Sequence, residues 1–281
     1  MSGTSSPRAS SAPPDFAALD ANLLESLREG ARWQRSARTL EADGLLLVRG
    51  STRFPVGLTN AVARIDPEVP PHEVLARARE FFGEDGRAFT LWVRGEPDAD
   101  LEAHAIHERL MPISEAPSPW MVLRKRLPEQ PAPSGVEVVR VRDAKDVADV
   151  VRVSQEAWAS VGLPPAETAA LLARPDRMLA SHHVWYLARV DGRPVATAMA
   201  LLACGVAGVY WVGCVPDARR RGLAERVTRA VGNAGFDAGM TVAALQASVM
   251  GHPVYLHMGY ETVSTTRWYL ARPSRSESRS G

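Results

Sequence analysis

The chain has 281 residues, which at about 150 residues per domain predicts two modules or one large one. Apolar residues make up 46% and charged residues 23%, proportions that are typical of soluble globular proteins and that exclude a wholly disordered chain. The net charge of +1 provides no overall field to attract a polyanion, so we expect no nucleic-acid partner.

We expect no secretory signal at the N-terminus. Residues 1–14 are small, polar and rich in Pro and Ser, without the apolar core of a secretory signal, and residues 272–281 form a short Ser/Arg segment. We expect both to be disordered tails. The cysteines, Cys204 and Cys214, are too few for a disulfide scaffold and fit a reducing compartment, so we expect a cytoplasmic protein.

One segment is long enough to raise the question of a membrane span. Val195–Val215 contains 21 uncharged residues, about the length of a transmembrane helix. Glycines interrupt it at 205, 208 and 213, and its Ala, Thr and Cys residues make it only mildly apolar. We interpret it as two buried strands joined by a turn at Gly205–Gly208, and we expect no membrane association.

A proline-rich stretch divides the chain. Leu127–Gly135 holds three prolines in nine residues, which neither a helix nor a central strand accommodates. We therefore predict an N-terminal domain over 15–127, a linker over 128–135 and a second domain over 136–271.

The N-terminal part alternates between helical and extended patterns, which indicates a mixed α/β module. Proline suits the first turn of the second helix, and Asp98 is a plausible N-cap of the third. The expected elements are a helix over Asp20–Arg38, strands over Leu45–Val48 and Gly57–Ile65, a helix from Pro70–Pro71 to Phe82, a strand over Phe89–Val93, a helix over Asp98–Leu110 and a strand over Trp120–Leu123.

The second part is also mixed α/β. Asp143 is expected to cap a helix, and Asp191-Gly192 to form a tight hairpin turn. The expected strands are Glu137–Val141, Val184–Val190, Pro194–Leu202, Val206–Val215, Val242–Ala247 and Thr266–Leu270; the expected helices run from Asp143 to Ser154, from Pro164–Pro165 to Ala173, through Leu223–Ala234 and over Pro253–Met258.

The strongest chemical signal lies where the fourth of these strands meets a helix. The segment Val212–Ala224 leads through an Arg/Gly-rich turn into an amphipathic helix. A helix N-terminus presents unpaired N–H groups and partial positive charge, which favour a phosphate or pyrophosphate ligand. Gly222 allows close approach of the backbone, and the arginines at 219–221 add charged donors.

This segment resembles motif A of the GNAT superfamily of N-acetyltransferases, Gln/Arg-x-x-Gly-x-Gly/Ala, with Arg219, Gly222 and Ala224 at its specified positions. The resemblance implies the GNAT fold for residues 136–271. It also implies that acetyl-CoA is the co-substrate. The residues expected to bind its pyrophosphate are Arg219, Arg220, Arg221, Gly222, Leu223 and Ala224, and those expected to contact its pantetheine arm are Val212, Gly213 and Cys214.

A second segment, Gln246–Tyr260, is similar to another signature of the same family. Tyr255, Gly259 and Tyr260 match it, and Ser248 stands where many members carry Asn. The resemblance implies that Tyr255 is the general acid that protonates the leaving CoA thiolate, and that Ser248 contacts the cofactor.

No residue of the motif A strand offers the general base that some family members place there, since Val209–Val215 contains no glutamate. The open alternatives are a water chain, a residue of the N-terminal module, or one of the side chains His182, His183, His252, His257 and Glu167. Cys214 lies in the cofactor strand, where packing is the expected role. We expect no metal ion.

The N-terminal half lacks motif A, yet its order of strands and helices resembles a degenerate GNAT unit, as in tandem members such as mycothiol synthase. Such a unit would form one wall of the acceptor cleft, with Asp66, Glu68, Trp92 and Trp120 as candidate lining residues.

These observations predict an N-acetyltransferase that moves an acetyl group from acetyl-CoA to a primary amine by direct attack in a ternary complex. The alternative is a non-catalytic acyl-CoA-binding sensor or partner-binding module. The acceptor stays open, as does the oligomeric state, a homodimer included.

Overall fold

The computed structural model describes residues 16–54, 57 and 59–272, so the two predicted tails lie outside it except for Arg272. The first half contains α1 (Phe16–Arg32), β1 (Arg38–Ala42), β2 (Leu45–Arg49), β3 (Asn60–Arg64), α2 (Pro71–Gly83), β4 (Phe89–Arg94), the short 3-10 turn η1 (Glu96–Asp98), α3 (Ala99–His107), β5 (Met111–Pro112) and β6 (Ser118–Leu123).

The second half contains β7 (Val136–Arg140), α4 (Ala144–Ala159), α5 (Pro165–Leu171), α6 (Pro175–Met178), β8 (His183–Val190), β9 (Arg193–Ala203), β10 (Val206–Cys214), η2 (Pro216–Ala218), α7 (Leu223–Asp237), β11 (Val242–Gln246), α8 (His252–His257) and β12 (Glu261–Ala271). The described strands form one twelve-stranded mixed sheet in the order β1-β2-β3-β4-β12-β6-β11-β10-β9-β8-β7, with β5 beside β12. This confirms the predicted mixed α/β class.

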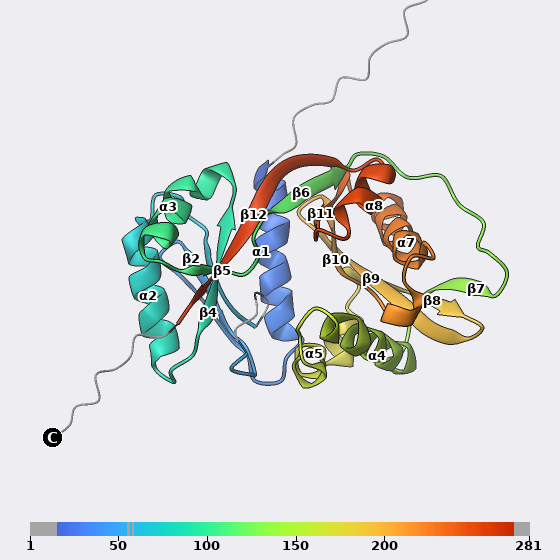
Figure 1. The fold of residues 1–281 in the computed structure, drawn as a ribbon, viewed down its shortest axis with the longest axis horizontal. Coiled ribbons are helices and arrows are strands. Elements are labelled where there is room, and N and C mark those ends of the chain that lie inside the picture. The colour runs from blue at the N-terminus through green and yellow to red at the C-terminus, as the bar shows by residue number, and fades with distance from the viewer. Residues whose placement is uncertain (1–15, 55–56, 58, 273–281) are drawn as a thin grey trace, which may run out of the picture.

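Both halves of the chain repeat one plan. β2 lies antiparallel to β3, and α2 then connects β3 to the parallel strand β4. In the second half β9 lies antiparallel to β10, and α7 connects β10 to the parallel strand β11. Figure 1 shows α7 and α4 on opposite sides of the strands β8–β10.

The last strand of each half pairs with the other half. β6 lies antiparallel to β11, with Ala243 opposite Leu123, and β12 lies antiparallel to β4, with Ala271 opposite Phe89. β6 and β12 also pair with each other, so the sheet is continuous between the halves, as the long curved β12 shows in Figure 1. The predicted division into two domains at 128–135 therefore stays a proposal, because strands from before this stretch pair with strands from after it.

Helix α1 belongs to the first half but also binds the second. The Asn22 side-chain amide donates to the carbonyls of Leu201, Ala203 and Val206, each at 3.1 Å, and its Oδ1 accepts the Tyr210 hydroxyl at 2.9 Å. A Cβ at Gly208 would lie 1.9 Å from this oxygen, so only glycine fits there. The buried amide therefore fixes α1 on β9 and β10.

Several local predictions are confirmed. Pro70 and Pro71 precede and open α2, the Asp143 carboxylate accepts the Asp146 N–H at 2.9 Å to cap α4, and Asp191-Gly192 turns with positive φ at both residues. Among the described residues no helix has the length and apolar character to cross a membrane, and Val195–Val215 lies in β9, β10 and the short turns that adjoin them.

Other local predictions are wrong. The first helix ends at Arg32 rather than Arg38, because strand β1 begins at Arg38. The chain then turns at Asp43-Gly44, where both residues have positive φ, and pairs β1 with β2. The turn before β10 is made by Cys204 and Gly205, not by Gly205–Gly208.

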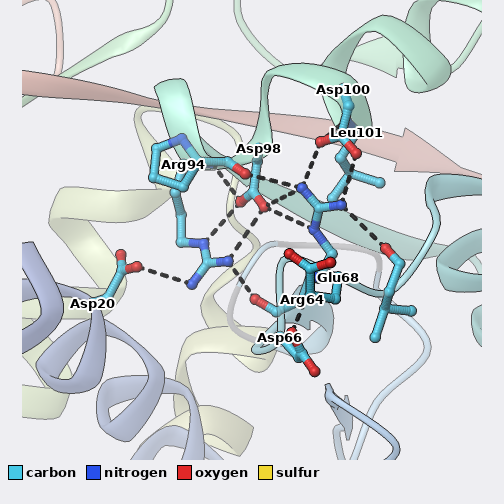
Figure 2. A network of polar contacts seen from close by, with 10 residues as sticks. Asp20, Arg64, Asp66, Glu68, Arg94, Asp98, Asp100 and Leu101 are labelled. Carbon is cyan, nitrogen blue, oxygen red and sulfur yellow. Dashed lines mark hydrogen bonds and ion pairs between the residues drawn. The ribbon is translucent and has the colours of Figure 1, made fainter.

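Asp98 makes no side-chain capping hydrogen bond at the start of α3, contrary to expectation. Its fully buried carboxylate instead joins the ends of β3 and β4 (Figure 2): Oδ1 accepts Arg64 Nε at 3.1 Å, and Oδ2 accepts Arg94 Nε at 2.8 Å. Arg64 also contacts Asp100, and Arg94 contacts Asp20 at 3.2 Å. Two buried guanidinium groups therefore share one buried carboxylate.

We expect Asp98→Asn to lower the free energy of unfolding by about 3–5 kcal/mol, because it leaves Arg64 and Arg94 buried without their shared negative charge. Urea unfolding followed by circular dichroism measures this. The control is Asp100→Asn, whose side chain is 53% exposed and whose loss should cost less than about 1 kcal/mol. Equal effects of the two substitutions would contradict this account.

Candidate functional site

The two parallel strands of the second half separate early. β10 pairs with β11 only over Val206–Gly208, opposite Val242–Ala244, although β10 continues to Cys214. Its pairing with β9 shifts register between Tyr210 and Gly213, and Trp211 has a φ of 55° within this bulge. Beyond Gly208, the edge of β10 that faces β11 has no strand partner among the described residues.

A cavity of about 460 Å³ opens where the strands part. Residues from β10, the start of α7, the segment before α8, α8 itself and the end of α4 line it. They are Ala157, Trp158, Val161, Val212, Gly213, Cys214, Ala218, Arg219, Arg220, Gly222, Leu223, Ala224, Glu225, Ser248, Met250, Gly251, Val254 and Tyr255. The structure therefore brings together both signature segments, and every predicted site residue except Arg221 lines the cavity.

The start of α7 faces this cavity with backbone donors. Gly222 is the N-cap, with a φ of 71°, and the Arg226 N–H bonds the Gly222 carbonyl at 3.1 Å. The N–H groups of residues 223–225 precede the first such bond and are free to bind an anion. Arg220, which also has positive φ, is exposed at the cavity.

The three arginines of the turn have different surroundings. Arg219 folds back onto the protein: its Nε donates to the Cys214 carbonyl at 3.2 Å, and its Nη2 donates to the Ala157 carbonyl at 3.3 Å and to the Ser160 hydroxyl. It thus ties β10 to the end of α4 rather than extending into the cavity. Arg221 is exposed outside the lining.

Cys214 is half-buried at the cavity wall. Desolvation by burial raises the pKa of its thiol, with Arg219 acting in the opposite direction. The thiol is therefore protonated at neutral pH, which suits packing better than nucleophilic attack. Gly213, beside it, lets α4 approach β10, since an added Cβ would lie 3.1 Å from the Ala157 Cβ.

Tyr255 lies on α8 at the cavity and is 8% exposed. Burial raises the pKa of its hydroxyl to about 12, so the group keeps its proton across the neutral and moderately alkaline range. Ser248 supports this helix, because its Oγ accepts the Gly251 N–H at 3.1 Å and its carbonyl accepts the His252 N–H at 2.9 Å. The Ser248 hydroxyl proton stays available for a ligand.

None of the general-base candidates proposed from the sequence lines the cavity; they are His182, His183, His252, His257 and Glu167. Burial, followed by the neighbouring His182, lowers the pKa of His183 to about 4, which makes it a poor proton acceptor. The glutamate lies on α5, where its Oε2 is buried without a hydrogen-bond partner in the described part of the chain.

The residues proposed for the N-terminal wall lie elsewhere. Trp92 and Trp120 are each 3% exposed core residues, and Asp66 accepts the Glu68 N–H in the turn before α2. Sequence reasoning did not foresee that the end of α4 lines the cavity, or that Trp33, which directly follows α1, packs on Trp185 of the second half. Only the apolar spacing of these helices was visible in the sequence, not the partners they meet.

Comparison with known proteins identifies this architecture. A family model described as an acetyltransferase (GNAT) domain matches residues 123–249. The chain carries a GNAT acetyltransferase domain. The match begins at the end of β6 and stops before α8, so Tyr255 and the exchanged strand β12 lie beyond it.

Solved structures extend the likeness to the whole chain. A GCN5-related N-acetyltransferase from Kribbella flavida is 24% identical, with a TM-score of 0.69 over 93% of this chain and 97% of that one. A GCN5-related N-acetyltransferase from Sphaerobacter thermophilus is 15% identical, with a TM-score of 0.60 over 93% and 97%. A tandem GNAT protein from the clavulanic acid biosynthesis pathway is 14% identical, with a TM-score of 0.58 over 96% and 91%.

At these identities the likeness concerns the fold, and it confirms the predicted tandem GNAT architecture. No curated protein matches the sequence. Most residues that line the cavity lie within the matched range, and Met250, Gly251, Val254 and Tyr255 directly follow it. The first half repeats the same plan without a motif A.

Proposed function

We propose that the protein is an acetyl-CoA-dependent N-acetyltransferase that transfers the acetyl group to a primary amine by direct attack in a ternary complex. The observation that carries the proposal is the cavity between β10 and β11, lined by both signature segments of the GNAT domain. Tyr255, a candidate proton donor, lines the same cavity as Val212–Cys214, and this favours a reaction over binding alone.

Acetyl-CoA fits the donors and surfaces of this cavity. The N–H groups at the start of α7 and the exposed Arg220 suit its pyrophosphate. The unpaired edge of β10 at Val212–Cys214 suits the amide groups of the pantetheine arm, which would add to the sheet as a strand does. Met250 and Val254 offer apolar contact on the other side.

The proposed reaction develops negative charge on the carbonyl oxygen and then on the sulfur, and the chain has a hydrogen-bond donor for each. Attack of a neutral amine on the thioester carbonyl develops an oxyanion, and in this proposal a backbone N–H at the β10 bulge stabilises it. The attacking nitrogen then loses its surplus proton to water, and the C–S bond breaks to give the amide and the CoA thiolate. A thiol has a pKa of ~8.5, so full transfer of the Tyr255 proton is uphill, and its hydroxyl stabilises the sulfur chiefly as a hydrogen-bond donor.

The pyrophosphate position is tested by Gly222→Asp. Acetyl-CoA at about 100 times its Kd should stabilise the wild type by ~2.7 kcal/mol, a rise of several degrees in Tm. The aspartate places negative charge at the α7 N-terminus, so the rise in Tm should disappear. Thermal melts with and without acetyl-CoA measure this.

The matched control is Gly86→Asp. Gly86 is exposed in the N-terminal half, has a φ of 66°, and like Gly222 has open space around it. This variant carries the same backbone strain and the same added charge but should keep the acetyl-CoA response. A preserved response in Gly222→Asp would refute the proposed pyrophosphate site.

The role of Tyr255 is tested by Tyr255→Phe, which should lower kcat about 10²-fold or more and leave the Kd for CoA little changed. Because burial holds the pKa of Tyr255 at about 12, the wild-type kcat should not fall near pH 10, where an ordinary tyrosine loses its proton. Steady-state kinetics across pH, read by release of the CoA thiol, measures both. An unchanged kcat in the variant would exclude Tyr255 as the donor.

Direct attack is tested by Cys214→Ala. The protonated, half-buried thiol predicts that the variant keeps kcat within a few-fold and that no acetylated enzyme forms. Double-reciprocal plots for the two substrates should intersect, and intact-protein mass spectrometry after incubation with acetyl-CoA alone should show no added acetyl group. Parallel plots with an acetylated Cys214 would establish a covalent mechanism instead.

A further inference from the structure

A second cluster of chemically active side chains lies away from the cavity, where α1 of the first half meets the start of β8. Glu29 Oε1 is 3.2 Å from His182 Nε2, and Glu29 Oε2 is 3.5 Å from His183 Nε2. One ligand atom from each residue lies within 4.8 Å of the other two. Neither the comparisons nor the proposed reaction uses this cluster.

The protonation of His183 follows from its contacts. Its Nδ1 lies 3.0 Å from the Arg177 carbonyl, which only accepts, so Nδ1 carries the hydrogen. In the neutral ring, Nε2 then presents a lone pair. This atom is buried, has no hydrogen-bond partner in the described part of the chain, and faces a carboxylate oxygen. Two lone pairs that face each other in a buried site repel, and a cation bound between them would relieve this repulsion.

We propose that Glu29, His182 and His183 bind a divalent transition-metal ion of the zinc type. Two histidines and one glutamate are an established ligand set for zinc, and histidine ligands commonly donate the other ring N–H to a carbonyl, as His183 does. Zinc–ligand bonds of ~2.0–2.2 Å at tetrahedral angles separate a nitrogen and an oxygen ligand by about 3.4 Å. The observed separations of 3.2 and 3.5 Å lie on either side of this value.

The surroundings leave room for the ion. The His182 side chain is 42% exposed, which gives the ion a path from solvent and leaves a fourth position for water. Arg32 also contacts Glu29, but this half-exposed guanidinium has a second partner in Glu25 at 2.6 Å. Arg32 therefore keeps Glu25 as a partner when a cation takes its place at Glu29.

The ion would join the two halves of the chain. Glu29 lies on α1, and His182 and His183 lie at the entry to β8. Trp33, one turn beyond Glu29, packs on His183 with ring centroids 5.1 Å apart. A shared ion would hold α1 against β8 and stabilise the folded protein. This proposal departs from the expectation, drawn from the sequence, that no metal is bound.

The test uses the full chain without a polyhistidine tag, first stripped with a chelator. Addition of Co²⁺ should give a visible absorption band at one equivalent, and Zn²⁺ should abolish the band and raise the Tm. His182→Ala removes a partly exposed ligand, so the variant should fold. It should bind Zn²⁺ at least about tenfold more weakly, since even loss of an outer-shell partner costs 10–100-fold.

Two further variants make the result specific. His72→Ala removes an exposed histidine on α2 and should behave as the wild type. Glu29→Gln keeps the shape of the side chain but removes its charge, and should weaken Zn²⁺ binding as His182→Ala does. Absence of a Co²⁺ band and of a Zn²⁺-dependent rise in the wild-type Tm would overturn the proposal, as would equal metal binding by wild type and His182→Ala.

Discussion

The early end of the parallel pairing between β10 and β11 is the constraint on which the site depends. A parallel strand normally satisfies its backbone along its whole length, but here the pairing stops at Gly208 and Ala244. The bulge at Trp211 turns the strand and leaves its edge unpaired. The cavity, the free edge and the exposed start of α7 all follow from this separation, because α7 begins where β10 ends.

In the first half the corresponding parallel strands also separate early, but side chains occupy the space between their ends. β3 and β4 also pair over only three residues, Ala61–Ala63 opposite Thr90–Trp92. Beyond that point Arg64 and Arg94 converge on Asp98 and join the two strand ends (Figure 2). The turn before α2 carries acidic side chains, and Pro71 brings no N–H to the helix start. The negative charge of this turn and the missing N–H donor therefore disfavour phosphate binding at the start of α2. The start of α7 in the second half has neither feature.

Much of this fold was predictable from sequence, because helix caps, turn residues and buried runs are local signals. The residues that line the cavity were predictable for the same reason: Gly222 and Tyr255 belong to two short segments with recognisable spacing. The exchange of β6 and β12 was not, since strand pairing across more than a hundred residues leaves no local pattern. Asp98 was wrongly predicted to cap α3. Its carboxylate binds the buried guanidinium groups of Arg64 and Arg94 instead of making a capping bond that would have stayed near solvent.

The contacts that α1 and the following Trp33 make with the second half could not be predicted from the sequence. Trp33 lies 6.3 Å from Trp211 between ring centroids, and Trp211 sits in the bulge and packs in turn on Trp158 of α4, 6.0 Å away. The residue that directly follows α1 therefore packs on the strand bulge beside the cavity of the second half. Asn22 holds the same helix on β9 and β10 by buried hydrogen bonds, which have no solvent to replace them. The degenerate half thus acts on the site by fixing the shape of β10, a role that needs no cofactor of its own.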